Sequence, residues 1–235
     1  MALADDIQAL TARTLSALEA SHDYFTYTKR VWRLLQQVVK EGRTFTFRNR
    51  TTGTKVDEQV LLGRAQLYIT DYLMSSTFQH FVSLFEDFTF ELLRFWLAAY
   101  PASLTRKQVE MGAVLKAPDK SAIVLTVVDK ELNELKYERL ADWFAYLDRL
   151  TNLDRPTAGE IEKLAEIKAS RDILVHNNGI ANATYVSKAG ILARYNVGDK
   201  LEIPEQYHRA SWEIINKVVR DISAAAIAKI RPSHP

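Results

Sequence analysis

The chain has 235 residues, of which 47% are hydrophobic and 26% are charged, and its formal net charge is +2. This composition is typical of a folded globular protein and excludes a largely disordered chain. The absence of cysteine excludes disulfides, thiolate-bound zinc and cysteine nucleophiles, and it agrees with a reducing compartment such as the cytoplasm.

Neither the first residues nor the hydropathy pattern indicates export or membrane insertion. The segment Met1–Gln8 contains two aspartates and lacks a basic start followed by an apolar run, which a signal peptide requires. No stretch of about 20 uncharged apolar residues occurs, as a membrane-spanning helix would need. We therefore expect a cytoplasmic protein without a membrane partner.

The first third of the chain predicts a long helix followed by an irregular insertion. Only 8 Gly and 6 Pro are present, which favours long helices over a many-stranded sheet. Apolar residues spaced by three and four predict a helix over residues 5–39, with a bend near Ser21–Asp23. His22 is expected to be solvated at this bend. Gly42 ends the helix, and residues 44–55 are predicted to form a loop or short hairpin.

This part of the chain is also basic. Between Tyr24 and Lys55 there are eight Lys or Arg residues and one acid, Glu41, so the local excess is seven positive charges. Phe residues of the alternating run Thr44-Phe45-Thr46-Phe47 are interleaved with Arg residues here, and such a set could stack on and neutralise nucleic acid. Arg48, Arg50 and Lys55 are accordingly candidate RNA-binding residues. The alternative is a solvated connector.

The middle of the chain predicts the central helix of a bundle. The pattern is helical over residues 57–100, and residues 78–97 are apolar on nearly every side, as in a helix surrounded by others. Pro101 ends this helix. His80, Glu86 and Asp87 lie within it and could in principle serve a metal-dependent hydrolase. Ordinary edge positions explain them better, and we expect no metal and no cofactor.

The remaining elements complete an all-α fold. Helices are predicted over residues 121–135, 137–150 and 158–175, the last opened by a capping box of Thr157 and Glu160. Residues 185–200 are expected to be irregular, with short extended pieces. A C-terminal amphipathic helix follows from Pro204 to about residue 230, with His208 expected on the surface. The prediction is one helical domain over residues 1–235, with an N-terminal helical extension of about 1–56 and a core of about 57–230.

The densest polar chemistry lies at the end of the helix over residues 158–175. At about 100° per residue, Asp172 and His176 are about 40° apart and could share a hydrogen bond. Arg171 is about 140° from His176. The two can meet only if the guanidinium wraps around the helix or if a second copy of the helix supplies the missing partner.

Such a group of side chains could cleave RNA without a metal. Histidine would act as general base or acid, arginine would hold the phosphate and its developing charge, and the 2′-hydroxyl would be the nucleophile. Asp172 would fix the histidine tautomer. The structural alternative is a histidine favoured by the helix dipole beside ordinary ion pairs.

The run from Arg171 to His176 resembles the signature of the HEPN superfamily (higher eukaryotes and prokaryotes nucleotide-binding domains). That signature is an Arg, often followed by a polar residue, and then a His four to six residues later. The segments 84–101 (from Leu84-Phe85-Glu86-Asp87-Phe88 to Tyr100-Pro101), 137–144 and 175–180 resemble further parts of the pattern found in bacterial defence-linked members. The likeness spans about residues 60–222.

The resemblance implies an all-α homodimer and, as in many members, a metal-independent endoribonuclease with a site between two protomers. Arg171 and His176 would be the catalytic pair and Asp172 the polar residue after the arginine, with Asn177 beside them contacting RNA. Such members often act as toxins or in phage defence, which would add an antitoxin or another defence protein as a partner. Members paired with nucleotidyltransferase antitoxins carry a tyrosine where this chain has Asn178, so regulation through that tyrosine is not implied. The alternative function is a non-catalytic dimerisation or nucleotide- and RNA-sensing module.

Overall fold

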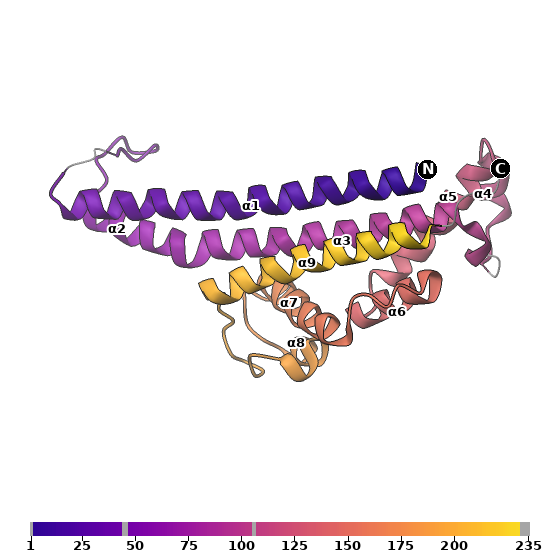
Figure 1. Cartoon of the computed structure of the whole chain (residues 1–235). Helices are drawn as coiled ribbons and strands as arrows, with labels where there is room; N and C mark the ends of the chain where they lie inside the picture. Colours follow the sequence, from indigo (N-terminus) through magenta and orange to yellow (C-terminus); the bar gives the residue numbers. More distant parts are fainter. Residues whose placement is uncertain (1, 44–46, 105–106, 231–235) are drawn as a thin grey trace.

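The computed structural model describes residues 2–43, 47–104 and 107–230. The fold over these residues is all-α, as predicted: helices account for almost all regular structure, and no strand forms among them. Two isolated antiparallel bridges, between Arg48 and Lys55 and between Ile180 and Lys200, are the extended pairings within these ranges. Three long helices lie side by side, and a group of shorter helices packs beneath them (Figure 1).

The N-terminal helix α1 (Ala2–Lys40) runs without interruption along α3 and α9 (Figure 1). The predicted bend near Ser21–Asp23 is therefore wrong. Ser21 is buried, and its hydroxyl lies 3.1 Å from His80 Nδ1. His22 is not a solvated bend residue but stacks on Trp212, with 4.3 Å between ring centroids. Partners on α3 and α9 thus hold these residues inside the helix.

The predicted central helix is confirmed as α2 (Glu58–Leu67), a π-helical turn (Tyr68–Tyr72) and α3 (Leu73–Ala99) in unbroken succession. Asp57 caps the start by accepting a hydrogen bond of 2.9 Å from the backbone N–H of Gln59. The 3-10 turn Pro101–Leu104 follows. α3 buries residues on most of its circumference because α1, α5, α7 and α9 all pack against it.

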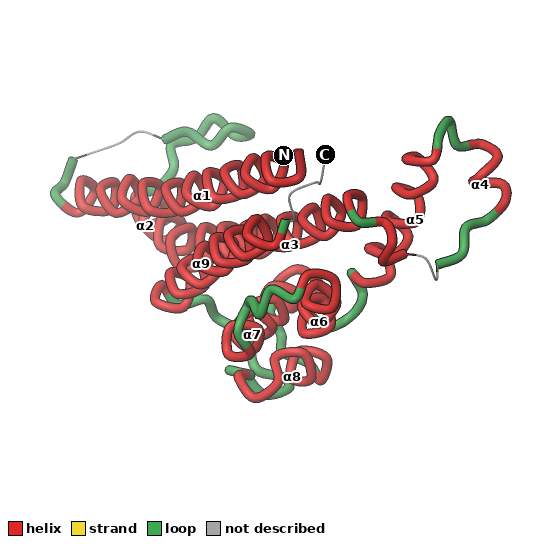
Figure 2. The backbone as a smooth tube through the Cα atoms, turned by 45° about the vertical axis from the view of Figure 1, so that its right-hand side comes forward, coloured by secondary structure: helices red, strands yellow, loops and turns green. Residues whose placement is uncertain are grey.

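Three further helices follow α3 and lead to the site-bearing helix. They are α4 (Met111–Lys116), α5 (Lys120–Leu135) and α6 (Leu140–Thr151). The predictions for residues 121–135 and 137–150 agree with α5 and α6 to within a few residues. Figure 2 shows α4 and the start of α5 extending away from the long helices, whereas α6 lies beneath them beside α7 and α8.

Helix α7 (Ala158–His176) starts and stops where the sequence predicts. Thr157 and Glu160 form the capping box. Gly179 adopts a φ of +75°, which favours glycine, and its N–H bonds back to the carbonyl of Ile173 at 3.0 Å. The predicted irregular stretch 185–200 is partly wrong, because its first residues belong to α8 (Ala183–Ala189) and a 3-10 turn (Gly190–Leu192) follows. Residues 193–200 are irregular apart from the bridge at Lys200.

The last helix, α9 (Glu205–Lys229), is the predicted C-terminal amphipathic helix. His208 was expected on the surface, but its side chain is fully buried against Phe25 and Phe81. α1 contributes Ile7, Leu10 and Leu18 to the same hydrophobic cluster as α3 and α9. The division into an N-terminal extension and a core stays a prediction.

No helix in the described ranges combines the length and the apolar character needed to cross a membrane.

Candidate functional site

The end of α7 opens onto a cavity of about 1060 Å³. α7 contributes Lys168, Arg171, Asp172 and His176 to its wall, and Lys188 reaches it from α8. The opposite walls come from α1, from α3 around Glu86, and from the turn before α6. The cavity therefore gathers side chains that are far apart in sequence around the candidate catalytic residues.

A cluster of five charged side chains occupies this cavity. Arg171 forms ion pairs with Glu86 of α3 and, at 3.1 Å, with Asp172. Lys168 lies 3.2 Å from Glu86 and 2.9 Å from Asp172. Lys188 lies 3.9 Å from Asp172. We call Glu86, Lys168, Arg171, Asp172 and Lys188 the ion cluster: two carboxylates hold three cations at one place.

Four of the five side chains of the ion cluster are largely shielded from solvent, whereas that of Lys188 is 40% exposed. The side chains of Arg171, Lys168, Glu86 and Asp172 are exposed by 14%, 15%, 19% and 21%. Lys168 also lies over the ring of Trp143, 5.4 Å from its centroid. Arg171 Nε is buried without a hydrogen-bond partner in the described part of the chain. Coulombic attraction is stronger under such partial desolvation than at an open surface, so these pairs fix the cationic groups firmly.

The predicted hydrogen bond between Asp172 and His176 does not form. The Asp172 carboxylate instead pairs with Lys168, Arg171 and Lys188, and these three cations leave no place on it for the His176 imidazole. His176 is the last residue of α7 and is exposed, and its side chain makes no hydrogen bond or ion pair within the described ranges. The predicted role of Asp172 in fixing the histidine tautomer is therefore wrong for this arrangement.

Helical geometry left two ways for Arg171 and His176 to meet. The Arg171 guanidinium is held by Glu86 and Asp172, and both Arg171 and His176 line the same cavity. The two side chains make no contact with each other in the described ranges, so completion of the pair by a second copy of the helix stays a prediction. The homodimer expected from the resemblance stays a prediction.

The other candidate RNA-binding residues are placed differently. Asn177 uses its side-chain amide to donate a 2.5 Å hydrogen bond to the carbonyl of Ile180, which stabilises the turn after α7. Arg48 donates to the carbonyl of Gly53 at 3.0 Å, and the exposed Arg50 and Lys55 lie in the same small hairpin. This hairpin follows the C-terminal end of α1, whereas the cavity lies beside Arg13. The 27 residues from Arg13 to Lys40 correspond to about 40 Å of helix.

Sequence reasoning missed the lysines of the ion cluster and its carboxylate partner on α3. Lys168 stands four residues before Asp172, the spacing of a helical ion pair, and could have been found on that ground. Glu86 was expected, like His80 and Asp87, at an ordinary edge position, with a metal ligand as the weaker alternative. Here Glu86 instead binds two cations. Within the described residues no group of three or more His, Asp or Glu is arranged to hold a metal ion.

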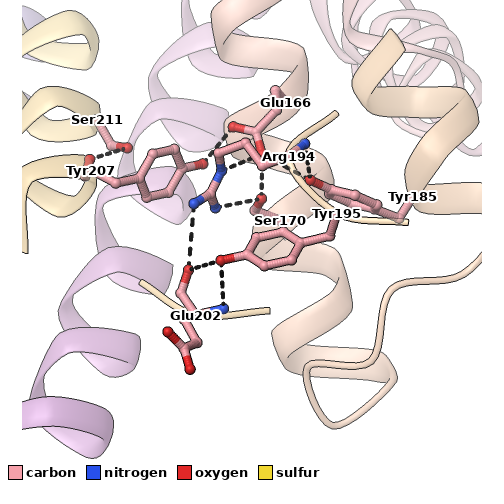
Figure 3. A network of polar contacts seen from close by, with 8 residues as sticks. All are labelled: Glu166, Ser170, Tyr185, Arg194, Tyr195, Glu202, Tyr207 and Ser211. Carbon is pink, nitrogen blue, oxygen red and sulfur yellow. Dashed lines mark hydrogen bonds and ion pairs between the residues drawn. The ribbon is translucent and has the colours of Figure 1, made fainter. Parts of the chain in front are cut away.

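A second buried polar network, also missed, holds the irregular segment against α7 and α9 (Figure 3). Its centre is Glu166, which is 4% exposed. The carboxylate accepts hydrogen bonds from Ser170 at 2.7 Å, Tyr207 at 2.7 Å, Arg194 at 3.0 Å and Tyr185 at 3.1 Å. The Arg194 guanidinium also lies 3.4 Å from the centroid of the Tyr207 ring. Burial, reinforced by the charge of Glu166, raises the pKa of Tyr207 well above its ordinary value.

The same network fixes the position of one member of the ion cluster. Tyr185 lies in α8, the helix that carries Lys188, and Glu166 and Ser170 lie in α7, which carries Lys168 and Arg171. Because Glu166 binds Tyr185 and the following segment through Arg194, it holds α8 against α7 (Figure 3). The network therefore positions Lys188 beside Asp172.

Comparison of the chain with protein-family models, with curated proteins and with solved structures gave no significant match.

Proposed function

We propose that the cavity at the end of α7 is the site of a metal-independent endoribonuclease of the HEPN type. The observation that carries this proposal is that Arg171 and His176 line one cavity, together with Lys168 and Lys188. A histidine free of protein partners in the described ranges and several fixed cations are the groups that cleavage of a phosphodiester by its own 2′-hydroxyl needs.

In this proposal each side chain of the cavity has one role in cleaving the phosphodiester. His176 takes the proton of the 2′-hydroxyl, whose oxygen attacks the adjacent phosphorus and displaces the 5′-oxygen of the next nucleotide. A cyclic 2′,3′-phosphate forms on one fragment, and the leaving 5′-oxygen of the other takes up a proton from water. Arg171, Lys168 and Lys188 stabilise the negative charge that builds on the phosphate oxygens. Asp172 and Glu86 hold these cations before RNA binds.

Phosphate binding then requires an exchange of anions. Arg171 is already paired with Glu86 and Asp172 through its two terminal nitrogens, so an RNA phosphate would compete with these carboxylates for them. The exchange never leaves the arginine as an unpaired buried charge, because one anion takes the place of another. The carboxylates thereby weaken RNA binding while keeping the cations in position.

We also propose a homodimer, with the exposed end of α7 in the interface. Val175 and Ile180 flank His176 and are exposed by 47% and 39%. Apolar residues beside a catalytic histidine would be covered if a second protomer approached here, and its Arg171 and His176 could then complete the site. Light scattering at working concentration tests this assembly. A strictly monomeric protein with full activity would exclude a site shared between protomers.

The ribonuclease proposal is tested by incubating the purified protein with single-stranded RNA in the presence of EDTA. Cleavage should persist and leave cyclic phosphate ends. His176→Ala should lower the rate about 10²–10⁴-fold, the usual contribution of a general acid–base group. Arg220→Ala changes an exposed arginine on α9 and serves as the control. If folded His176→Ala protein cuts as fast as the wild type, the proposal fails.

The alternative is a non-catalytic module that binds RNA or a nucleotide. It is favoured by the absence of any side chain orienting His176 within the described ranges and by the two carboxylates already holding Arg171. In that case RNA should bind without cleavage that depends on His176. The basic hairpin with Arg48, Arg50 and Lys55 would serve either function as a second RNA contact. A role in toxicity or phage defence in the cytoplasm, with an antitoxin as partner, is part of the same proposal.

A further inference from the structure

A second concave site lies between the middle of α1 and the first turn of α9. It has a volume of about 340 Å³, at the lower end of the range usual for small-ligand sites. α1 contributes Lys29, Arg30 and Arg33 to its lining, and α9 contributes His208 and Arg209. We call this the α1–α9 pocket. None of these residues lines the proposed ribonuclease cavity, so the α1–α9 pocket is a separate site.

Positive charge dominates the α1–α9 pocket. Four cationic side chains, Lys29, Arg30, Arg33 and Arg209, meet one carboxylate, that of Glu205, which leaves an excess of three charges. Lys29 is 6% exposed and is ion-paired with Glu205. This contact with Lys29, together with the charges of Arg33 and Arg209, lowers the pKa of Glu205. The arginines therefore lie close enough to act on an anion at the same place.

The backbone adds to this attraction. Glu205, His208 and Arg209 lie in the first turns of α9, a helix of 25 residues, so the positive end of its dipole lies near the pocket that these residues line. The residue before the helix, Pro204, provides no side-chain cap. A helix start without a capping oxygen leaves N–H groups that an external anion can use.

His208 adds a more specific requirement. Its Nε2 lies 2.8 Å from the hydroxyl oxygen of Thr77, and that hydroxyl donates to the carbonyl of Leu73 at 2.7 Å. Since a hydroxyl has one proton to donate, Nε2 carries the proton of the imidazole and donates to Thr77. Burial lowers the pKa of His208 to about 4, so the ring is neutral. Nδ1 is then a buried lone pair, and it has no partner in the described part of the chain.

We propose that the α1–α9 pocket binds a phosphate group that keeps an O–H, with the cations holding its charged oxygens and His208 Nδ1 accepting its proton. Inorganic phosphate near pH 6 has this form, and a singly protonated phosphate monoester has it as well. Sulfate has the same shape but no proton at this pH. The geometry therefore assigns a preference for phosphate over sulfate, which charge attraction alone would not give.

Titration calorimetry at pH 6 and constant ionic strength tests the site with inorganic phosphate, sulfate and adenosine 5′-monophosphate. Phosphate should bind about tenfold or more tightly than sulfate. If only the nucleotide binds, the ligand of the pocket is a phosphate monoester. If inorganic phosphate and the nucleotide both bind, the pocket recognises the phosphate group that they share. If neither binds at millimolar concentration, the proposal is overturned.

Arginine variants test whether phosphate binds in the α1–α9 pocket. Arg33→Ala and Arg209→Ala remove exposed cations, so the fold should persist, and each should weaken phosphate binding about tenfold. Arg220→Ala removes an exposed arginine from the same helix as Arg209 but outside the pocket, and it should change little beyond its contribution to net charge. Equal effects of Arg209→Ala and Arg220→Ala would show non-specific attraction and would overturn the site.

His208→Gln tests the proton acceptor. The glutamine amide can keep the donor bond to Thr77, but it offers no acceptor at the position of Nδ1. Phosphate binding should fall to the level of sulfate in this variant. Equal binding of phosphate and sulfate to the wild type would already overturn the role of Nδ1, whether or not the variant folds. Lys188→Ala removes a cation from the ribonuclease cavity and should leave this phosphate binding unchanged, which separates the two sites.

Discussion

Arg171 on α7 is ion-paired with Glu86 on α3, so the arginine of the candidate catalytic pair is tied to the central helix of the bundle. Glu86 also binds Lys168 at 3.2 Å. One carboxylate thus holds two of the cations that would contact an RNA phosphate. It holds α7 to α3 at this point, and under the proposed function it would also compete with an RNA phosphate.

Glu86→Gln should therefore strengthen RNA binding while weakening the fold. Without its negative charge, position 86 no longer competes with phosphate for Arg171 and Lys168, and we expect affinity for single-stranded RNA to rise several-fold. Loss of two partly buried ion pairs should cost about 1–3 kcal/mol of unfolding free energy. Fluorescence anisotropy at two salt concentrations and urea unfolding measure the two effects.

Asp87→Asn is the matched control for this change. Asp87 is the next residue, is exposed, lines the same cavity and has no ion pair in the described ranges. The substitution alters net charge by the same amount without releasing Arg171. Equal gains in RNA affinity for both variants would mean that net charge alone is responsible and that Glu86 does not compete for the arginine.

The fold could be predicted from the sequence to a large extent, because helices of this length repeat their apolar residues every three or four positions. The same local reasoning predicted the capping box at Thr157 and the end of α7 near Gly179. It failed where a partner came from far along the chain. His208 is buried because Thr77, 131 residues away, accepts its hydrogen bond, and no local pattern reveals that.

The candidate site shows the same limit. Local spacing brought attention to Arg171, Asp172 and His176, but it also predicted a bond between Asp172 and His176 that does not form. Lys188, one of the cations that pair with Asp172 in place of His176, lies in α8, which was not predicted as a helix. The buried position of Glu166 could not be predicted either, since its partner Arg194 lies in a segment without regular periodicity. Tertiary packing determines which charged side chains pair, and residue spacing within one helix predicts only the pairs that form inside that helix.

Glu166→Gln should destabilise the protein strongly. The buried carboxylate accepts hydrogen bonds from Ser170, Tyr185 and Tyr207 and pairs with Arg194 (Figure 3). Neutralising it leaves Arg194, whose side chain is 25% exposed, without its counter-charge. Breaking a buried pair on one side typically costs about 3–5 kcal/mol, and partial exposure of Arg194 reduces this to about 2–4 kcal/mol.

Urea unfolding measures the loss, and Glu162→Gln provides the comparison on the same helix. Glu162 is exposed, so its substitution should change the unfolding free energy by less than about 0.5 kcal/mol. A Glu166→Gln protein as stable as the Glu162→Gln protein would show that the network contributes no stability.

His208 should make stability depend on pH between about 6.5 and 4. Burial, with smaller contributions from His22 and Lys29, lowers its pKa from 6.5 to about 4, and Glu205 opposes this shift. The unfolded chain takes up a proton near pH 6.5 and the folded chain only near pH 4, so unfolding becomes easier as pH falls between these values. From pH 7 to pH 5 this residue should remove about 2 kcal/mol of unfolding free energy.

The measurement is urea unfolding of the wild type and of His208→Gln at pH 7 and pH 5. Other groups titrate in both proteins, so the difference between the two pH dependences isolates His208. The wild type should lose about 2 kcal/mol more than the variant. Parallel losses would mean that His208 titrates normally in the folded protein.

Gly179→Ala should weaken the end of α7. Gly179 has a φ of +75°, a conformation that costs a residue with a Cβ about 1 kcal/mol. The space itself is adequate: an added Cβ would lie 3.7 Å from a Leu174 methyl carbon and 3.8 Å from the carbonyl oxygen of Leu201. Backbone strain therefore decides the effect, and the melting temperature should fall by several degrees.

Gly159→Ala, in the first turn of the same helix with no atom within 4 Å of the added Cβ, should leave the melting temperature unchanged or raise it. If both substitutions raised the melting temperature, the left-handed cap would not be holding the end of α7.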